Sequence, residues 1–101
     1  MTESKINSWI FLATSLASQK QPADINEISM IADGINHLVP TEKELKTSLN
    51  WLINEGLILK QGNKYALTEI GKTKFDNASK TTSVLFKIWD NLDDDLQIIQ
   101  S

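Results

Sequence analysis

Apolar residues recur every three or four positions in several segments of the chain, which is the spacing that places them on one face of an α-helix. A first amphipathic helix is predicted over residues 4–17, with Phe11 almost opposite its apolar stripe and Leu12 beside the stripe. The stripe consists of Ile6, Trp9, Ile10, Ala13, Leu16 and Ala17. A loop is predicted over residues 19–23, because Pro22 would break a continuing helix.

Two further helices begin at strong N-terminal signals. Asp24 is a suitable N-cap for the second helix, and Glu27 stands three residues later, in the position of a capping box. Thr41 and Glu44 repeat this pattern at the third helix. That helix is predicted to stop at Gly56, a residue suited to the left-handed C′ position.

The polar and apolar pattern changes after the third helix. Two short β-prone runs, residues 57–60 and 64–67, are separated by a segment containing Gly62-Asn63, a favoured two-residue hairpin turn. A two-stranded hairpin is marginally stable alone, so it must pack against the helices.

The last part of the chain predicts two more helices. The first is short, over residues 68–75, and is weakened by Gly71. A break at residues 76–79 separates it from a final helix at about 82–99. The apolar stripe of the final helix is Leu85, Ile88, Leu92, Leu96 and Ile99, with Trp89 beside it.

The fold class expected from these elements is mainly α with a small β-hairpin (α+β). A chain of 101 residues allows one hydrophobic core, so a single domain is predicted. Its core is expected over about residues 4–76, with the helix at 82–99 as an additional C-terminal element.

Two sequence patterns lie at the junction of the third helix and the hairpin. Residues 49–58 read Leu-Asn-Trp-Leu-Ile-Asn-Glu-Gly-Leu-Ile, and residues 65–71 read Tyr-Ala-Leu-Thr-Glu-Ile-Gly. This arrangement resembles the winged helix-turn-helix domains of bacterial and archaeal transcriptional regulators, over roughly residues 7–75. The resemblance implies a three-helix core, a two-stranded wing and binding of duplex DNA.

The third helix has a polar face that suits such binding. At 100° per residue, its apolar residues form one arc and its polar residues the opposite arc. The candidate DNA-binding residues on this helix are Lys43, Lys46, Thr47, Asn50 and Asn54. Lysine binds phosphates or guanine edges, and asparagine pairs with adenine. The alternative interpretation is an ordinary solvated helix face.

Two lysines of the hairpin are further candidates. Lys60 and Lys64 flank the turn, and the resemblance implies that they contact the DNA backbone or minor groove. Lysines on a hairpin edge also prevent edge-to-edge aggregation, so the protective interpretation stays open.

The apolar surface of the terminal helices favours a homodimer. The final helix has more apolar surface than a monomer of this size needs, and many regulators with the domain it resembles dimerise through terminal helices. The proposed contact residues are Phe11, Leu85, Ile88, Trp89, Leu92 and Leu96. Packing of the same stripe against the first helix of its own chain is the alternative. Trp51, off the core arc of the third helix, is expected to be buried within the chain or in a dimer.

The charge distribution makes the DNA hypothesis specific to one part of the chain. The total is −3, all ten cations are lysines, and residues 41–80 have seven lysines against five acids. Residues 81–101 have one lysine against four aspartates, which would repel DNA. The DNA-binding surface is therefore expected away from the final helix, and the absence of arginine makes binding dependent on phosphate charge.

Composition excludes several other classes. The chain has no cysteine and one histidine, His37, so a thiolate or histidine metal site, a cysteine nucleophile and a catalytic triad are not expected. The aspartates of the final helix lack the glycine turn of a calcium loop. No cofactor or enzymatic activity is predicted, and no signal peptide or membrane span is visible, which favours a cytoplasmic protein.

The leading functional hypothesis is thus a small DNA-binding transcriptional regulator. The alternative is a winged-helix protein–protein interaction module that does not bind DNA, favoured by the net charge, the lack of arginine and the apolar Trp51 and Phe11. The ligand of any effector pocket between the terminal helices is not indicated by the sequence.

Overall fold

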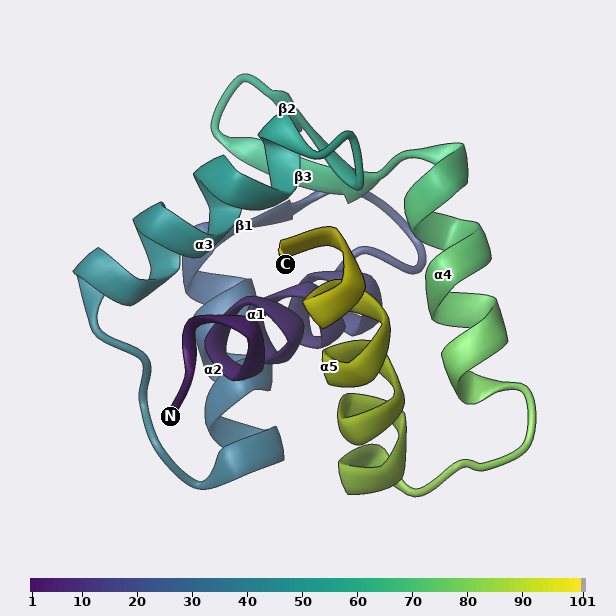
Figure 1. Ribbon diagram of the computed structural model, residues 1–101. Helices are drawn as coiled ribbons and strands as arrows, with labels where there is room; N and C mark the ends of the chain where they lie inside the picture. The colour runs from purple at the N-terminus through teal and green to yellow at the C-terminus, as the bar shows by residue number, and fades with distance from the viewer. Residues whose placement is uncertain (101) are drawn as a thin grey trace.

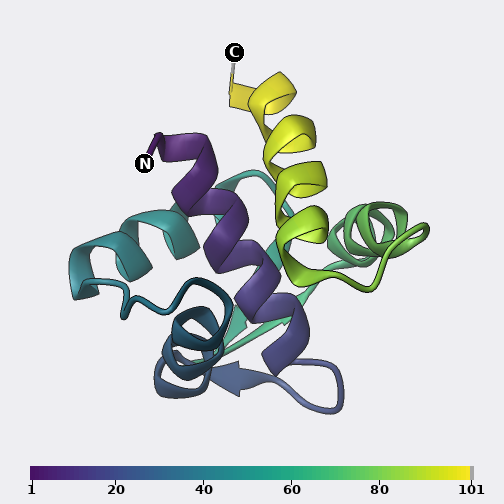
Figure 2. The ribbon, with the colours of Figure 1, turned by 90° about the horizontal axis from the view of Figure 1, so that it is seen from below.

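Helix α1 (Glu3–Ala17) is the central element of the structure (Figure 1). The computed structural model describes residues 1–100 of the chain. Seven consecutive α1 residues, from Ser8 to Thr14, have no exposed surface, so the middle of this helix is covered on all sides. Helices α2 and α3 cover one side of α1 and α5 covers the other (Figures 1 and 2).

Both predicted capping boxes are present. Helix α2 (Ile25–Asn36) is capped by Asp24, and helix α3 (Glu42–Asn54) is capped by Thr41. In each case the N-cap side chain accepts a hydrogen bond from the third helical residue, whose own side chain accepts from the N-cap backbone N–H. His37 closes α2 in the left-handed conformation, with φ of 53°, and therefore has a capping position.

The predicted hairpin follows α3 directly. Strand β2 (Ile58–Gln61) pairs antiparallel with strand β3 (Lys64–Leu67), leaving Gly62 and Asn63 as the two turn residues. The φ of Gly62 is +63°, the positive value that a type II′ turn requires at its first central residue. The left-handed Gly56 before the hairpin is also confirmed, with φ of +73°.

A third strand was not predicted. Residues 23 and 24 form strand β1 (Ala23–Asp24), which pairs antiparallel with β3 and gives the strand order β1-β3-β2. The prediction of a loop here is wrong, because two residues are too short to show an alternating pattern and the pairing is made with residues some 40 positions away.

Helix α4 (Glu69–Ser79) is longer than expected. The predicted break at 76–79 is wrong because tertiary contacts continue the helix there. Ala78 is buried, and its carbonyl oxygen accepts a hydrogen bond from Asn91 Nδ2 at 2.9 Å. Ser79 Oγ donates to the Phe75 carbonyl at 2.8 Å. Residues 76–79, whose types favour a turn, are therefore held in helical geometry by packing on α5.

Helix α5 (Leu85–Gln100) belongs to the hydrophobic core, which thus extends well beyond residue 76. The dimer surface predicted from six residues is wrong for five of them, because these are buried inside the protomer against α1 and its neighbours. The five are Phe11, Ile88, Trp89, Leu92 and Leu96. Leu85 is 38% exposed, so it alone offers surface to another molecule. The homodimer itself stays a prediction.

The stacked indoles of Trp9 and Trp89 explain why α5 packs on α1. Their ring centroids are 6.1 Å apart. Trp9 Nε1 donates to the Ala32 carbonyl at 2.9 Å, and Trp89 Nε1 donates to the Lys5 carbonyl at 3.0 Å. Each indole therefore buries its ring while its N–H is hydrogen-bonded, which is the arrangement that makes a buried tryptophan favourable.

The fold is mainly helical with a small antiparallel sheet, as predicted for the α+β class. Over residues 1–100, no helix has the length and apolar character needed to cross a bilayer.

Candidate nucleic-acid interface

The outer face of α3 presents the polar side chains predicted from its periodicity. All five are exposed: Lys43, Lys46, Thr47, Asn50 and Asn54. The opposite face is anchored in the core by Leu45, Leu49 and Leu52. The helix is therefore fixed in orientation by its apolar side, which leaves its amide, hydroxyl and ammonium groups pointing outward.

The two hairpin lysines are also exposed, and one of them lies over a buried ring. Lys60 is paired across the strands with Tyr65, and its Nζ lies 5.9 Å from the centroid of the Tyr65 ring. Tyr65 is 8% exposed, so the ring is held by the core while the lysine head remains in solvent. Lys64 lies opposite Gln61 at the last pair before the turn.

Lys46 has an ion-pair partner in its own helix. Its Nζ lies 2.7 Å from the Glu42 carboxylate, one helical turn earlier. The hydrogen bond and charge of Lys46 hold the pKa of Glu42 below its usual range, and Glu42 in turn raises the pKa of Lys46. Tyr65 adds a smaller contribution that also raises the pKa of Lys46.

The acidic residues of α5 lie across α1 from this face. In both ribbon views α1 separates α3 from α5 (Figures 1 and 2). Asp90 pairs with Lys5 of α1 at 2.7 Å, and Asp95 pairs with Lys74 of α4 at 3.1 Å. The acidic helix is therefore partly neutralised by its neighbours, and its carboxylates do not lie on the exposed face of α3.

Trp51 packs against the core of its own chain, which is one of the two placements predicted for it, but it is only partly buried there. It borders a pocket of about 230 Å³ between α1 and α3, to which Lys43 and Thr47 also contribute.

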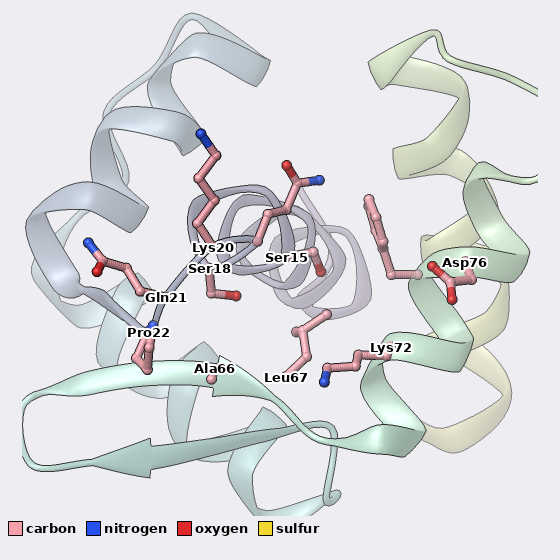
Figure 3. Close-up of a pocket in the computed structure, with 11 residues that line it drawn as sticks. Ser15, Ser18, Lys20, Gln21, Pro22, Ala66, Leu67, Lys72 and Asp76 are labelled. Atoms are coloured by element: carbon pink, nitrogen blue, oxygen red, sulfur yellow. The ribbon is translucent and has the colours of Figure 1, made fainter.

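A second pocket, of about 460 Å³, lies between the C-terminal end of α1, the following loop, β3 and α4 (Figure 3). Its hydroxyl groups already donate within α1, since Ser15 Oγ donates to the Phe11 carbonyl and Ser18 Oγ to the Thr14 carbonyl. Lys20 points away from Lys72 in Figure 3, so the two cations do not converge on one ligand position. The terminal helices α1 and α5 pack directly on each other and do not enclose this pocket.

Sequence reasoning missed two features of the α3 region. The Glu42–Lys46 ion pair had a visible signal, because Glu and Lys four residues apart face each other on a helix. The burial of Asn7 and Ser48 between α1 and α3 had no signal in the sequence, because both residue types are as common on exposed helix faces as in such contacts. Over the described residues no group of three or more histidine, cysteine, aspartate or glutamate side chains is placed to hold a metal ion.

Comparison with known protein families, with curated proteins and with solved structures gave no match.

Proposed function

We propose that the protein is a small DNA-binding regulator of the winged helix-turn-helix type. Its recognition helix is α3, which enters the major groove, and its wing is the β2–β3 hairpin, which contacts the flanking backbone. The order of elements supports this assignment, since three helices are followed by a hairpin and the hairpin joins a short strand that precedes α2.

One observation supports DNA binding most strongly. The exposed lysines lie on two elements that pack against each other, Lys43 and Lys46 on α3 and Lys60 and Lys64 on the hairpin, and Lys60 lies over the ring of the buried Tyr65. A helix and a hairpin with cations at their junction form a surface that follows both a groove and the adjacent phosphates. The acidic helix α5 lies on the other side of α1 from α3, so its negative charge is kept away from this approach.

The side chains divide between two kinds of contact. The lysines bind phosphates, whereas Asn50 and Asn54 have the donor and acceptor pair that matches an adenine edge. Because the chain has no arginine, the arginine contact to guanine that is common in this class of interface is absent, and only lysine is left to bind a guanine edge. Phosphate charge is therefore the larger part of the affinity.

Replacement of Lys43 and Lys46 by alanine is expected to weaken duplex binding about 20-fold at ~0.1 M salt, because each lost phosphate contact forfeits the release of a counterion. Fluorescence anisotropy with a labelled genomic duplex measures the effect. Lys80→Ala with Lys87→Ala is the matched control, since it removes the same charge from exposed positions at the α4–α5 connection. Equal affinities for the two double variants would contradict the assignment of α3 as recognition helix.

Replacement of Glu42 by glutamine is expected to tighten duplex binding about threefold. The change removes a carboxylate from the first turn of the recognition helix and frees Lys46 from its ion pair. Glu69→Gln is the control, because Glu69 occupies the first turn of α4 and pairs with Lys72 at 3.5 Å. Tightening by both variants to the same extent, measured in the same anisotropy titration, would show a general charge effect and contradict a role of Glu42 at the interface.

A protein–protein interaction module is the second candidate function. Phe11 no longer supports it, because this ring is buried. The supporting observation is instead a run of exposed apolar residues at the start of α5, in which Val84 and Phe86 are each 52% exposed and Leu85 lies between them. Absence of any duplex binding by the unmodified protein would favour this second function.

A further inference from the structure

The buried polar side chains divide into two groups. Among the residues whose burial the structure describes, six polar ones are buried: Ser4, Asn7, Ser8, Thr14, Ser15 and Ser48. The side chains of four of them form hydrogen bonds. Asn7 and Ser48, only 6% and 1% exposed, have no hydrogen-bond partner for their side chains within the part of the chain that the structure describes.

These two residues line the same pocket. Asn7 comes from α1 and Ser48 from α3, and both border the cavity of about 230 Å³ beside Trp51. A buried amide or hydroxyl without a partner is unfavourable, because it has lost its hydrogen bonds to water and gained none. Two such groups at one cavity are available to a hydrogen-bonding molecule that enters it.

The walls of the pocket restrict the chemistry of that molecule. Ile6 and the indole of Trp51 provide apolar surface, and a flat ring stacks well on an indole. The charged side chains of the lining are Lys43, Glu3 and Glu44, and Glu44 already accepts a hydrogen bond from the Thr41 backbone N–H at 2.9 Å. The lining therefore has mixed charge, which favours a neutral molecule over an ion.

We propose that this pocket binds a small, neutral, planar molecule with a carboxamide or lactam edge. Asn7 presents one acceptor and two donors, so it pairs with an amide group through two hydrogen bonds. Ser48 adds a hydroxyl that donates or accepts, and Trp51 stacks on the ring. The volume of about 230 Å³ is below the roughly 300–1,000 Å³ typical of drug-sized ligands, so the ligand has one or two rings.

Occupancy of the pocket also affects the proposed interface. Lys43 and Thr47 line the pocket and belong to the exposed face of α3, so a bound molecule and a DNA backbone compete for the same side chains. This second step rests on the proposed DNA-binding function. The pocket would in that case be an effector site at which the ligand lowers duplex affinity.

Benzamide is the probe for the binding step, because it combines a flat ring with a carboxamide. The three indole N–H resonances of the protein are followed by NMR, and that of Trp51 is assigned with the Trp51→Phe variant. Benzamide is expected to shift the Trp51 signal with a dissociation constant on the order of 1 mM. The isosteres acetophenone, which lacks the amide donors, and benzoate, which is charged, are expected to bind at least about fivefold more weakly.

Two variants test the polar groups separately from the fold. Asn7→Leu and Ser48→Ala are expected to weaken benzamide binding about tenfold, because each removes a hydrogen-bonding partner. Ser48→Ala is also expected to leave the thermal midpoint unchanged or raised, since it removes an unpartnered buried hydroxyl. Ser29→Ala, on the half-buried face of α2, is the control and is expected to bind benzamide as the unmodified protein does.

An unshifted Trp51 signal at ~20 mM benzamide would overturn the proposed site, as would equal binding of acetophenone or full binding by the folded Ser48→Ala variant. The proposed competition between ligand and DNA is tested separately, by measuring duplex affinity in the anisotropy titration with benzamide present. A Trp51 shift with unchanged duplex affinity would overturn the competition alone, whereas no duplex binding without benzamide would overturn the proposed function and leave the pocket standing.

Discussion

Replacement of Gly71 by alanine is expected to destabilise the protein by about 3 kcal/mol, the upper part of the range for overpacking. Gly71 is buried in the first turn of α4, and a methyl group there would overlap the backbone carbonyl of Leu57. That carbonyl also accepts a hydrogen bond from the Thr68 backbone N–H at 3.1 Å, so it is not free to move aside. The glycine that weakens α4 as a helix therefore permits its close approach to the start of the hairpin.

A second helical glycine provides the matched control. Gly34 lies in α2, and an added methyl group would contact nothing. Gly34→Ala is expected to stabilise the protein by about 0.5–1 kcal/mol, because alanine loses less backbone entropy in a helix. Urea unfolding followed by circular dichroism measures both free energies of unfolding. Equal stability of Gly71→Ala and the unmodified protein would contradict the tight contact between α4 and Leu57.

Replacement of Leu92 by alanine is expected to cost about 3–4 kcal/mol of the free energy of unfolding. Leu92 has no exposed surface and packs with Trp89 and Leu96 in the core between α5 and α1. Removal of most of its side chain leaves a cavity that the surrounding rings cannot fill, so the loss of burial and the cavity both contribute. A loss of this size is a large fraction of the stability of a domain of 101 residues.

Leu85→Ala is the control for this result. It makes the same chemical change on the same helix and on the same predicted stripe, but Leu85 is 38% exposed. It is expected to cost less than about 1 kcal/mol. Similar losses for the two variants in urea unfolding would contradict the assignment of α5 to the core of the protomer.

Local signals predicted the elements whose ends are set by the chain itself. The capping boxes at Asp24 and Thr41 and the turn at Gly62 depend on residues three or fewer positions apart, and all are present in the structure. These interactions form within one turn of the chain, so their residue types are sufficient to locate them.

Elements that depend on distant contacts were not predictable in the same way. The pairing of β1 with β3 is made between segments far apart in sequence, and α4 continues through its turn-like end because α5 packs against Ala78. The apolar stripe of α5 was visible in the sequence, but the surface that covers this stripe was not. Phe11, which lies off the stripe of α1, is covered within the protomer and does not face a second copy. Periodicity identifies an apolar face without saying which surface covers it.

In the candidate interface, too, features set by local spacing could be predicted from the sequence, and features set by distant contacts could not. Exposure of Lys43, Thr47 and Asn50 followed from helical periodicity and is confirmed. The ion pair that occupies Lys46 was readable from its spacing to Glu42. The burial of Asn7 without a hydrogen-bond partner could not be predicted from the sequence, because it depends on how α1 packs against α3.

The salt dependence of duplex affinity tests the proposed DNA-binding surface most directly. If Lys43, Lys46, Lys60 and Lys64 each neutralise one phosphate, the logarithm of the association constant falls with the logarithm of salt concentration at a slope of about −3.6. Alanine at all four positions is expected to bring this slope close to zero, while the Lys80→Ala with Lys87→Ala control keeps it. A slope that is the same in the four-lysine variant and the unmodified protein would contradict DNA binding by α3 and the hairpin.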